Sequence, residues 1–346
     1  MVLVLLGCAR GVSSRGVGIS GSRAGFSGGG ELLWESDGEL ARDMDTIAIT
    51  GAKWVRLDVD WKSVESSPGA WNWRYTDRVV NAARSRGIQV LLVPTYTPPW
   101  ARQGVCAGTM YCPPADPGAF ANFVFATVAR YAPVGVHSYE IWNEPNWDPW
   151  WASGPNAAAY VQLLKPAYLK AHQADPFARV LTGGLAPHGD LAANPGDPRS
   201  PVNFLQAMYN AGARGYFDAF GIHPYPPLPH APLSGTLGWN ALLQTQTEHD
   251  IMARNGDGWK EIWGTEYGAP TGSTDPKAVS TGTQAQYITD GLRWWAGEPY
   301  TGPLFIHTVR DAPTNDPGDW HHHMGLLNIN FTPKPAFSVL TNLLAH

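Results

Sequence analysis

The chain has few charged residues for its length. Asp, Glu, Lys and Arg make up 15% of its 346 residues, and the formal net charge at pH 7 is -5. A typical globular protein is about 25% charged, and proteins that bind nucleic acids usually carry a strongly basic surface. The low, slightly acidic charge therefore argues against a nucleic acid as partner.

Cysteine is also scarce, with three residues in the whole chain. They include one close pair, Cys106 and Cys112, so a structural zinc site with four ligands is not expected. We prefer a disulfide between these two cysteines, closing a loop rich in Pro and Gly; two unrelated free thiols are the alternative. A disulfide would indicate an oxidising compartment.

No apolar run is long enough to span a bilayer, so we expect no transmembrane segment. The apolar start from Met1 to Cys8 suggests that residues 1–25 are the remnant of a signal peptide or a flexible N-terminal lead. Leu5-Leu6-Gly7-Cys8 also resembles a bacterial lipobox, which would make Cys8 the site of a lipid anchor. These features predict a secreted or cell-envelope protein.

Aromatic residues, in contrast, are abundant, with 16 Trp, 13 Tyr and 11 Phe. A flat indole can cover the apolar face of a sugar ring while the hydroxyl groups stay hydrogen-bonded around the rim. Together with the low charge, this excess predicts a largely neutral carbohydrate as ligand. The alternative is that most of the Trp residues fill the core.

From about residue 30 onward, apolar runs rich in β-branched residues alternate with stretches of helical periodicity. The expected strands are Val17–Ile19 (the weakest), Trp54–Asp58, Gln89–Pro94, Ser138–Trp142, Arg179–Gly183, Phe217–Ile222, Glu261–Thr265 and Pro303–Val309. The expected helices are Ser36–Gly51, Thr76–Gly87, Pro117–Tyr131, Asn156–Ala174, Pro201–Ala213, Trp239–Asn255, Thr283–Ala296 and Pro335–Ala345.

Eight strands alternating with eight helices predict an α/β fold, a single (β/α)8 TIM barrel with long βα loops over residues 26–346. An open, doubly wound sheet that binds a dinucleotide is the alternative. The chain lacks a Gly-x-Gly-x-x-Gly segment after its first strand, which argues against it. We see no domain boundary after about residue 25.

Two glutamates stand at the ends of predicted strands, where such barrels form their active sites. Glu144 follows the fourth strand and Glu266 follows the seventh, each after apolar residues. A pair of carboxyl groups is what cleavage of a glycosidic bond requires, one as acid and one as nucleophile or base. The alternative is that each glutamate caps a loop by accepting hydrogen bonds from backbone N–H groups.

The segment Asn143-Glu144-Pro145 on strand four, with Glu266 on strand seven, resembles the retaining (β/α)8-barrel glycoside hydrolases of clan A, most closely families 39 and 5. The resemblance implies that Glu144 is the general acid/base and Glu266 the nucleophile, with retention of configuration and no cofactor. The residues from about 26 to 346 would then form the catalytic domain.

The resemblance also assigns four neighbours of the pair. It implies that Arg56 lies beneath the nucleophile, where a buried guanidinium would hold Glu266 ionised, and that Asn143 contacts the sugar 2-hydroxyl. It places His223 and Tyr225 near the nucleophile, where the Tyr225 hydroxyl would donate to the carboxylate of Glu266. A surface ion pair for Arg56 and a purely structural histidine at position 223 are the alternatives.

Aromatic residues in the loops after strands three, four and eight are candidate platforms for sugar rings. We select Tyr96, Trp100 and Trp320 as substrate-binding residues, with Trp147, Trp150 and Trp151 as further candidates. His321-His322-His323 beside Trp320 invites comparison with a metal site. Three consecutive side chains cannot all point one way, and no carboxylate or Cys cluster accompanies them. We therefore expect a polar loop wall and no metal.

The chain is thus expected to be a glycosidase acting on a largely neutral oligosaccharide, polysaccharide or glycoconjugate, with a β-linkage. A transglycosidase would use the same two carboxyl groups, and the sequence does not separate it from a hydrolase. A degenerate barrel that only binds carbohydrate is the third possibility. Such barrels typically lose one carboxylate, whereas both are present here.

Overall fold

The computed structural model describes residues 18–188, 196–226, 228, 233 and 240–345, so the proposed signal-peptide remnant up to Val17, with Cys8, lies outside the described residues. Eight parallel strands form one sheet in the order β5-β4-β3-β2-β1-β8-β7-β6. The strands are β1 (Ala24–Ser27), β2 (Trp54–Asp60), β3 (Gln89–Thr95), β4 (Ser138–Ile141), β5 (Arg179–Thr182), β6 (Phe220–Ile222), β7 (Ile262–Tyr267) and β8 (Thr301–Ile306).

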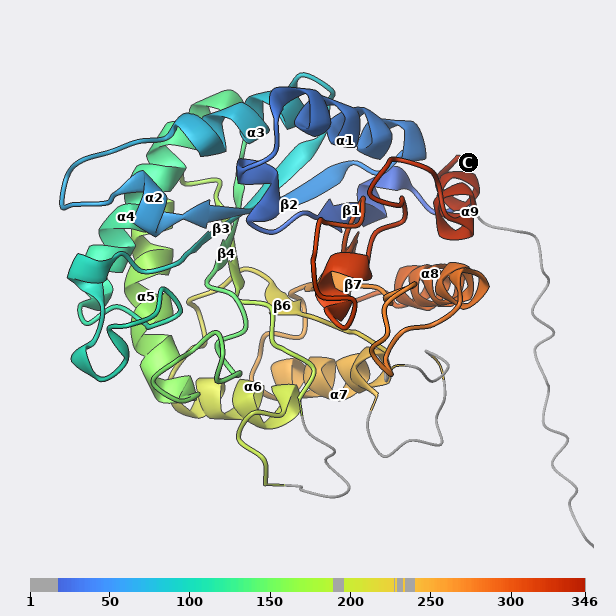
Figure 1. Ribbon diagram of the computed structural model, residues 1–346. Helices are drawn as coiled ribbons and strands as arrows, with labels where there is room; N and C mark the ends of the chain where they lie inside the picture. The colour runs from blue at the N-terminus through green and yellow to red at the C-terminus, as the bar shows by residue number, and fades with distance from the viewer. Residues whose placement is uncertain (1–17, 189–195, 227, 229–232, 234–239, 346) are drawn as a thin grey trace, which may run out of the picture.

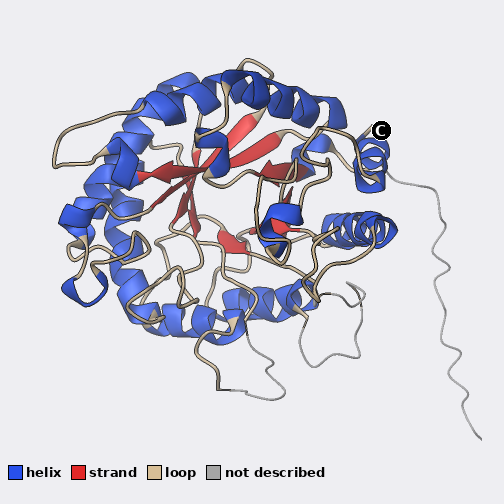
Figure 2. Cartoon of the chain, in the orientation of Figure 1, coloured by secondary structure: helices blue, strands red, loops and turns tan. Residues whose placement is uncertain are grey.

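The helices form a ring around the strands, as Figures 1 and 2 show. The α-helices are α1 (Asp37–Thr50), α2 (Trp61–Val64), α3 (Arg74–Arg84), α4 (Pro117–Tyr131), α5 (Ala157–Ala174), α6 (Pro201–Asn210), α7 (Ala241–Arg254), α8 (Thr281–Gly297) and α9 (Pro335–Leu344). Short 3-10 helices are η1 (Gly21–Arg23), η2 (Glu31–Leu33), η3 (Pro99–Ala101), η4 (Gly104–Cys106), η5 (Ala132–Val134) and η6 (Trp320–His323).

The sheet closes between its two edge strands, β5 and β6. Two isolated parallel bridges join these edges, Leu181 with Ala219 and Leu185 with Ile222. The backbone N–H of Leu185 also donates to the carbonyl of Gly221 at 3.2 Å. The closed ring of parallel strands inside a ring of helices confirms the predicted (β/α)8 barrel.

The first strand lies later than the sequence predicted. The prediction of Val17–Ile19 is wrong, because Ile19 is not in a strand and β1 spans Ala24–Ser27, starting two residues before the expected domain boundary. This strand has no β-branched residue. Its strand conformation comes from pairing with β2 on one side and β8 on the other. Glycine at position 25 permits this close pairing, because a Cβ atom there would lie 2.7 Å from Trp54 and from Phe305.

The inside of the barrel has an apolar floor and a polar upper layer. Leu91, Leu181, Ala219, Trp263 and Phe305 form a small buried cluster, with Trp54 packed against it. Trp54 and Trp263 stand at or near the first residues of their strands, so this cluster fills the end of the barrel where the strands begin. Only the opposite end, where the strands finish, is left for a site. None of the described helices is long and apolar enough to cross a membrane.

Candidate active site

The barrel brings Glu144 and Glu266 together at the C-terminal ends of β4 and β7. One carboxylate oxygen of each residue and the Nδ1 atom of His223 all lie within 4.8 Å of one another. Glu144 is buried, with 6% of its surface exposed, and the Glu266 side chain is 15% exposed. The expected carboxyl pair therefore exists as a spatial pair, on two facing sides of the barrel mouth.

The backbone around Glu144 adopts an unusual conformation that its neighbours hold in place. Trp142 and Glu144 have positive φ values of 71° and 45°, which non-glycine residues seldom adopt and which are concentrated at functional sites. The Glu144 N–H donates to the carbonyl of Gly184 at 3.1 Å, and the Trp142 indole N–H donates to the carbonyl of Trp150 at 2.8 Å. These contacts direct the Glu144 side chain into the barrel mouth.

The surroundings of Glu144 favour its protonated form. Burial raises the pKa of Glu144, and the charge of Glu266 adds to that increase, against a hydrogen bond and the charge from His223, which lower it. His223 Nδ1 lies 2.7 Å from Glu144 Oε1 and 3.5 Å from Glu266 Oε2. A carboxyl group with a raised pKa is suited to act as a general acid.

The surroundings of Glu266 favour its ionised form. Burial raises its pKa, but the charges of His223, His307 and Arg56 and the Tyr225 hydrogen bond outweigh it and lower the pKa of Glu266 to about 2. Arg56 Nη1 donates to Glu266 Oε1 at 2.8 Å, and the Tyr225 hydroxyl donates to Oε2 at 2.8 Å. An ionised and oriented carboxylate is suited to act as a nucleophile.

Arg56 lies at the centre of a buried network and is not part of a surface ion pair. It is 1% exposed. Its Nε and Nη2 atoms donate to the two oxygens of Glu140, both at 2.8 Å, and Nη2 also donates to Asn143 Oδ1 at 2.6 Å. This network fixes the guanidinium against Glu266 and orients Asn143 at the same time.

Glu140 is a member of this network that sequence reasoning missed. It is fully buried, and its Oε1 also accepts from the N–H of Gly184 at 2.8 Å. The signal was available: Tyr139 and Ile141 belong to the core outside the barrel, so alternation along the strand turns Glu140 inward.

A cavity of about 1060 Å³ opens over the carboxyl pair. Of the predicted substrate-binding residues, Arg56, Asn143, Tyr96, Tyr225 and Trp320 line it, as do the further candidates Trp147 and Trp150. Aromatic residues not predicted for this role also line it, namely Trp34 and Tyr111. His223 does not line it and instead contacts both glutamates from below.

Trp100 is not in the wall of this cavity, and its role as a substrate-binding residue stays a prediction. Its ring packs edge-on against Trp61, with centroids 5.5 Å apart, and its indole N–H donates to the carbonyl of Glu65 at 3.0 Å. Trp100 lies in η3, which begins at Pro99 after the cap residue Pro98. Trp151 does not line the cavity either; it is buried, with 2% exposed.

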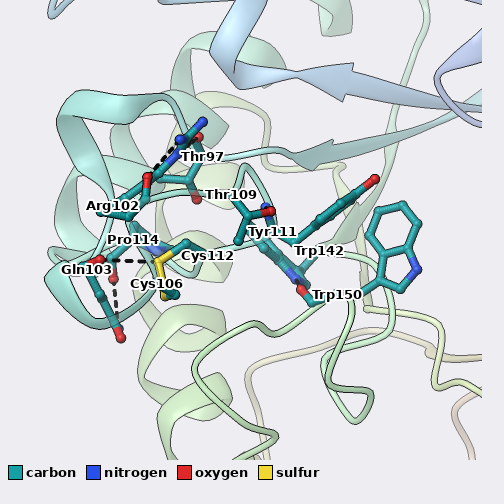
Figure 3. Close-up of a disulfide and its surroundings, with 11 residues drawn as sticks. Thr97, Arg102, Gln103, Cys106, Thr109, Tyr111, Cys112, Pro114, Trp142 and Trp150 are labelled. Atoms are coloured by element: carbon teal, nitrogen blue, oxygen red, sulfur yellow. Dashed lines mark hydrogen bonds between the residues drawn. A yellow bond between two sulfur atoms is a disulfide. The ribbon is translucent and has the colours of Figure 1, made fainter.

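The predicted disulfide is present and supports one wall of the cavity. Cys106 and Cys112 are bonded, and Figure 3 shows Tyr111 and Trp150 beside the loop that they close. Tyr111 packs edge-on against Trp150 at 4.7 Å and against Tyr96 at 5.9 Å. The disulfide thus holds a turn that carries one of the aromatic residues of the cavity.

Among the described residues, one group of candidate metal ligands comes together: Glu144, His223 and Glu266. Their donor atoms already bond to one another, to Arg56 and to Tyr225, and a cation placed there would face the Arg56 guanidinium. The three consecutive histidines after Trp320 do not form such a group within the same part of the chain. His322 instead pairs with Asp319 at 2.5 Å.

Comparison with known proteins agrees with this geometry. The family model described as Cellulase (glycosyl hydrolase family 5) matches residues 13–209, which is more than half of the chain. No curated protein sequence matches the chain.

Solved structures of glycoside hydrolases share the fold. A family 39 glycoside hydrolase from Bacteroides cellulosilyticus WH2 superposes with a TM-score of 0.73 at 21% identity, over 94% of this chain and 64% of the other. A family 39 β-xylosidase from Caulobacter crescentus gives 0.68 at 19% identity, over 96% and 73%. An enzyme of subfamily 18 of family 5 from Streptomyces cattleya, in complex with GlcNAc, gives 0.68 at 16% identity, over 94% and 80%.

This chain therefore spans less than two thirds of the Bacteroides enzyme. At these identities the superpositions show a shared barrel, and the family model reaches across β1 to β5 and their loops, including the Asn143-Glu144-Pro145 segment. The chain belongs to the cellulase family of glycosyl hydrolases, family 5.

Proposed function

We propose that this protein is a retaining glycosidase that hydrolyses β-linked bonds of a largely neutral oligosaccharide, polysaccharide or glycoconjugate. The observation that carries the proposal is the spacing of Glu144 and Glu266, with one oxygen of each within 4.8 Å. Retaining glycosidases hold their carboxyl groups about 5–5.5 Å apart, whereas inverting enzymes leave about 6.5–9.5 Å for a water molecule. The short spacing favours retention.

The opposite pKa shifts give each glutamate one role. Ionised Glu266 attacks the anomeric carbon while neutral Glu144 gives its proton to the glycosidic oxygen, and the bond between that carbon and oxygen breaks. The product is a glycosyl ester of Glu266, with Glu144 now ionised. Glu144 then takes a proton from water, the water oxygen attacks the anomeric carbon, and Glu266 leaves as a carboxylate.

The surrounding residues support these steps. Arg56 and Tyr225 each donate to one oxygen of Glu266, which holds the carboxylate ready for attack. Asn143 is expected to contact the sugar 2-hydroxyl, a bond that strengthens in the transition state. The aromatic wall formed by Tyr96, Trp150 and neighbouring rings suits the apolar faces of uncharged sugars.

The location follows from the same features. We propose that residues 26–346 act as one catalytic domain and that the protein is secreted or resides in the cell envelope. The disulfide between Cys106 and Cys112 supports an oxidising compartment. The lipid anchor at Cys8 stays a prediction, and mass spectrometry of the protein from membranes would test it.

The nucleophile is tested with Glu266→Ala. The variant should lose hydrolysis of p-nitrophenyl β-glycosides, and sodium azide should restore product, as the glycosyl azide of inverted configuration. Absence of rescue in a folded variant would contradict the role of Glu266. Adding an acceptor sugar to the wild type, with product analysis, separates hydrolysis from transfer.

The acid is tested with Glu144→Ala. Substrates with a 2,4-dinitrophenyl leaving group need little protonation, so their glycosylation rate should fall far less than that of natural glycosides. Equal losses for both kinds of substrate would show that Glu144 is not the acid.

A further inference from the structure

A third carboxyl group lies in the floor of the cavity and has no part in the double displacement. Asp58 is two residues after Arg56 on β2, so both side chains point into the barrel. Asp58 is 4% exposed and lines the same cavity as the two glutamates. Among the described residues, its side chain accepts a hydrogen bond from Tyr96, which is uncharged.

One oxygen of Asp58 is bound and the other is free. The Tyr96 hydroxyl donates to Oδ2 at 2.5 Å, whereas the buried Oδ1 has no hydrogen-bond partner among the described residues. A buried carboxylate oxygen without a donor is costly. Asp58 lines the cavity, so a donor on a molecule bound there would remove that cost once it reaches Oδ1.

Tyr96 is fixed in the conformation that orients Asp58. Its φ of 64° is unusual for a residue other than glycine, and its ring packs against Tyr111 at 5.9 Å and Trp150 at 5.8 Å. The N–H of Lys62 donates to the Tyr96 carbonyl at 2.9 Å. The hydroxyl of Tyr96 is therefore committed to one oxygen of Asp58, and the other oxygen is left for a ligand.

Glycine keeps the space beside this pair open. A Cβ atom on Gly30 would stand 3.6 Å from the Tyr96 hydroxyl and 3.7 Å from Asp58 Oδ2. Any larger side chain there would therefore reach into the space next to the carboxylate. The short loop after β1 therefore leaves space beside the Tyr96 hydroxyl and Oδ2 of Asp58.

We propose that the free oxygen of Asp58, oriented by Tyr96, accepts a hydrogen bond from a hydroxyl group of the sugar bound next to Glu266, and so determines which sugar is cleaved. The inference rests on the proposed glycosidase function. A sugar lacking that hydroxyl leaves Oδ1 unpaired, and a uronate places a second anion against it. The site thus selects a neutral sugar that carries this hydroxyl over its deoxy and uronate forms.

The acid side of the pH profile of kcat/KM gives an independent measurement of the role of Asp58. Burial raises the pKa of Asp58 to about 6, against the charge of Arg56 and the Tyr96 hydrogen bond, which lower it, while Glu266 and Glu140 raise it further. Glu266, with a pKa of about 2, cannot produce a limb near pH 6. If ionised Asp58 binds the substrate, kcat/KM should fall as the pH drops through about 6.

The test uses the p-nitrophenyl β-glycoside that the full-length wild type cleaves fastest, together with its monodeoxy and uronate analogues. One monodeoxy analogue should lose about 10- to 100-fold in kcat/KM, the range for a hydrogen bond to a charged group. Asp58→Asn should remove most of that selective loss. Asp60→Asn is the matched control: Asp60 lies on the same strand end, but Ser63 already binds both of its oxygens, so the selective loss should persist.

Tyr96→Phe gives the second test and does not depend on folding of the Asp58 variant. Removing the hydroxyl takes away a bond that lowers the pKa of Asp58, so the acid limb of kcat/KM should move to higher pH. The proposal would be overturned if wild type and a folded Asp58→Asn variant lose kcat/KM equally for every analogue. It would also be overturned if the acid limb of the kcat/KM profile does not move in Tyr96→Phe.

Failure of the proposed function has a different signature. In that case the wild type cleaves none of the glycosides and matches Glu266→Ala. Calorimetric binding of the corresponding methyl glycosides to wild type and Asp58→Asn then decides the Asp58 inference by itself, because it measures the same selective loss without catalysis. Equal affinities of both proteins for every analogue would refute it.

Discussion

Glu140→Gln should destabilise the protein strongly although it changes one atom of a buried side chain. Oε2 accepts from Arg56 Nε, and Oε1 accepts from Arg56 Nη2 and the N–H of Gly184, all at 2.8 Å. An amide has one acceptor oxygen, so in either orientation its NH₂ group faces an N–H donor. The substitution also leaves the buried guanidinium with one carboxylate fewer.

The magnitude follows from this loss. Breaking a buried ion pair by removing one partner typically costs about 3–5 kcal/mol. Unfolding entropy is about 2.1 cal/mol/K per residue, so for 346 residues the cost corresponds to a drop in melting temperature of about 4–7 °C. Because Arg56 orients Glu266, kcat on an aryl glycoside should fall as well.

Glu248→Gln is the matched control. Glu248 on α7 is also fully buried, but neither of its oxygens has a hydrogen-bond partner among the described residues. Burial raises the pKa of Glu248 to about 8, so it is mostly neutral at pH 7, and an amide replaces it without loss of an ion pair. Equilibrium urea unfolding at pH 7 should show a large loss for Glu140→Gln and none for Glu248→Gln. Equal losses would refute this account of the Arg56 network.

Three further outcomes are expected. Because the folded pKa of Glu248 lies above the unfolded value, the wild type should lose stability relative to Glu248→Gln as the pH rises from about 5 to 8; urea midpoints that stay parallel would contradict this. Replacing Cys106 and Cys112 together by Ser should loosen the aromatic wall and raise KM more than it lowers kcat, and a change confined to kcat would argue otherwise. Trp150→Ala should raise KM roughly tenfold, whereas Trp100→Ala should lower the melting temperature and leave KM as it is.

The parts of the molecule that the sequence made predictable are those set by local pattern. The alternation of strands and helices predicted the barrel, and the positions of the strand ends predicted that Glu144 and Glu266 lie at its mouth. The hydrogen bond expected from Tyr225 to Glu266 is present. The two glutamates follow from where a strand ends, because parallel strands of a barrel deliver their last residues to one face. The Tyr225 bond follows from the family resemblance.

The parts that were missed depend on contacts between segments far apart in the sequence. β1 has no strand-forming pattern of its own and is held by β2 and β8. Trp100 follows a strand as Tyr96 does, but its ring packs against Trp61 and does not line the cavity. The sequence could have predicted that Asp58 faces the barrel interior, since it lies two residues beyond Arg56 on β2. It could not show that one oxygen of Asp58 is unpaired, because that depends on the position of Tyr96 beside it.

The position of His223 between the two glutamates fits the movement of charge that the proposed double displacement requires. Burial lowers the pKa of His223, but the charge of Glu266 and the bond to Glu144 outweigh it and raise the pKa. In the proposed mechanism, the negative charge is on Glu266 before the first step and on Glu144 in the glycosyl ester. Because His223 Nδ1 lies 2.7 Å from Glu144 and 3.5 Å from Glu266, one imidazolium can stabilise the charge in both positions without moving. Arg56 remains paired with Glu140 throughout, so the network need not rearrange when Glu266 becomes neutral, which keeps the reorganisation of the site small.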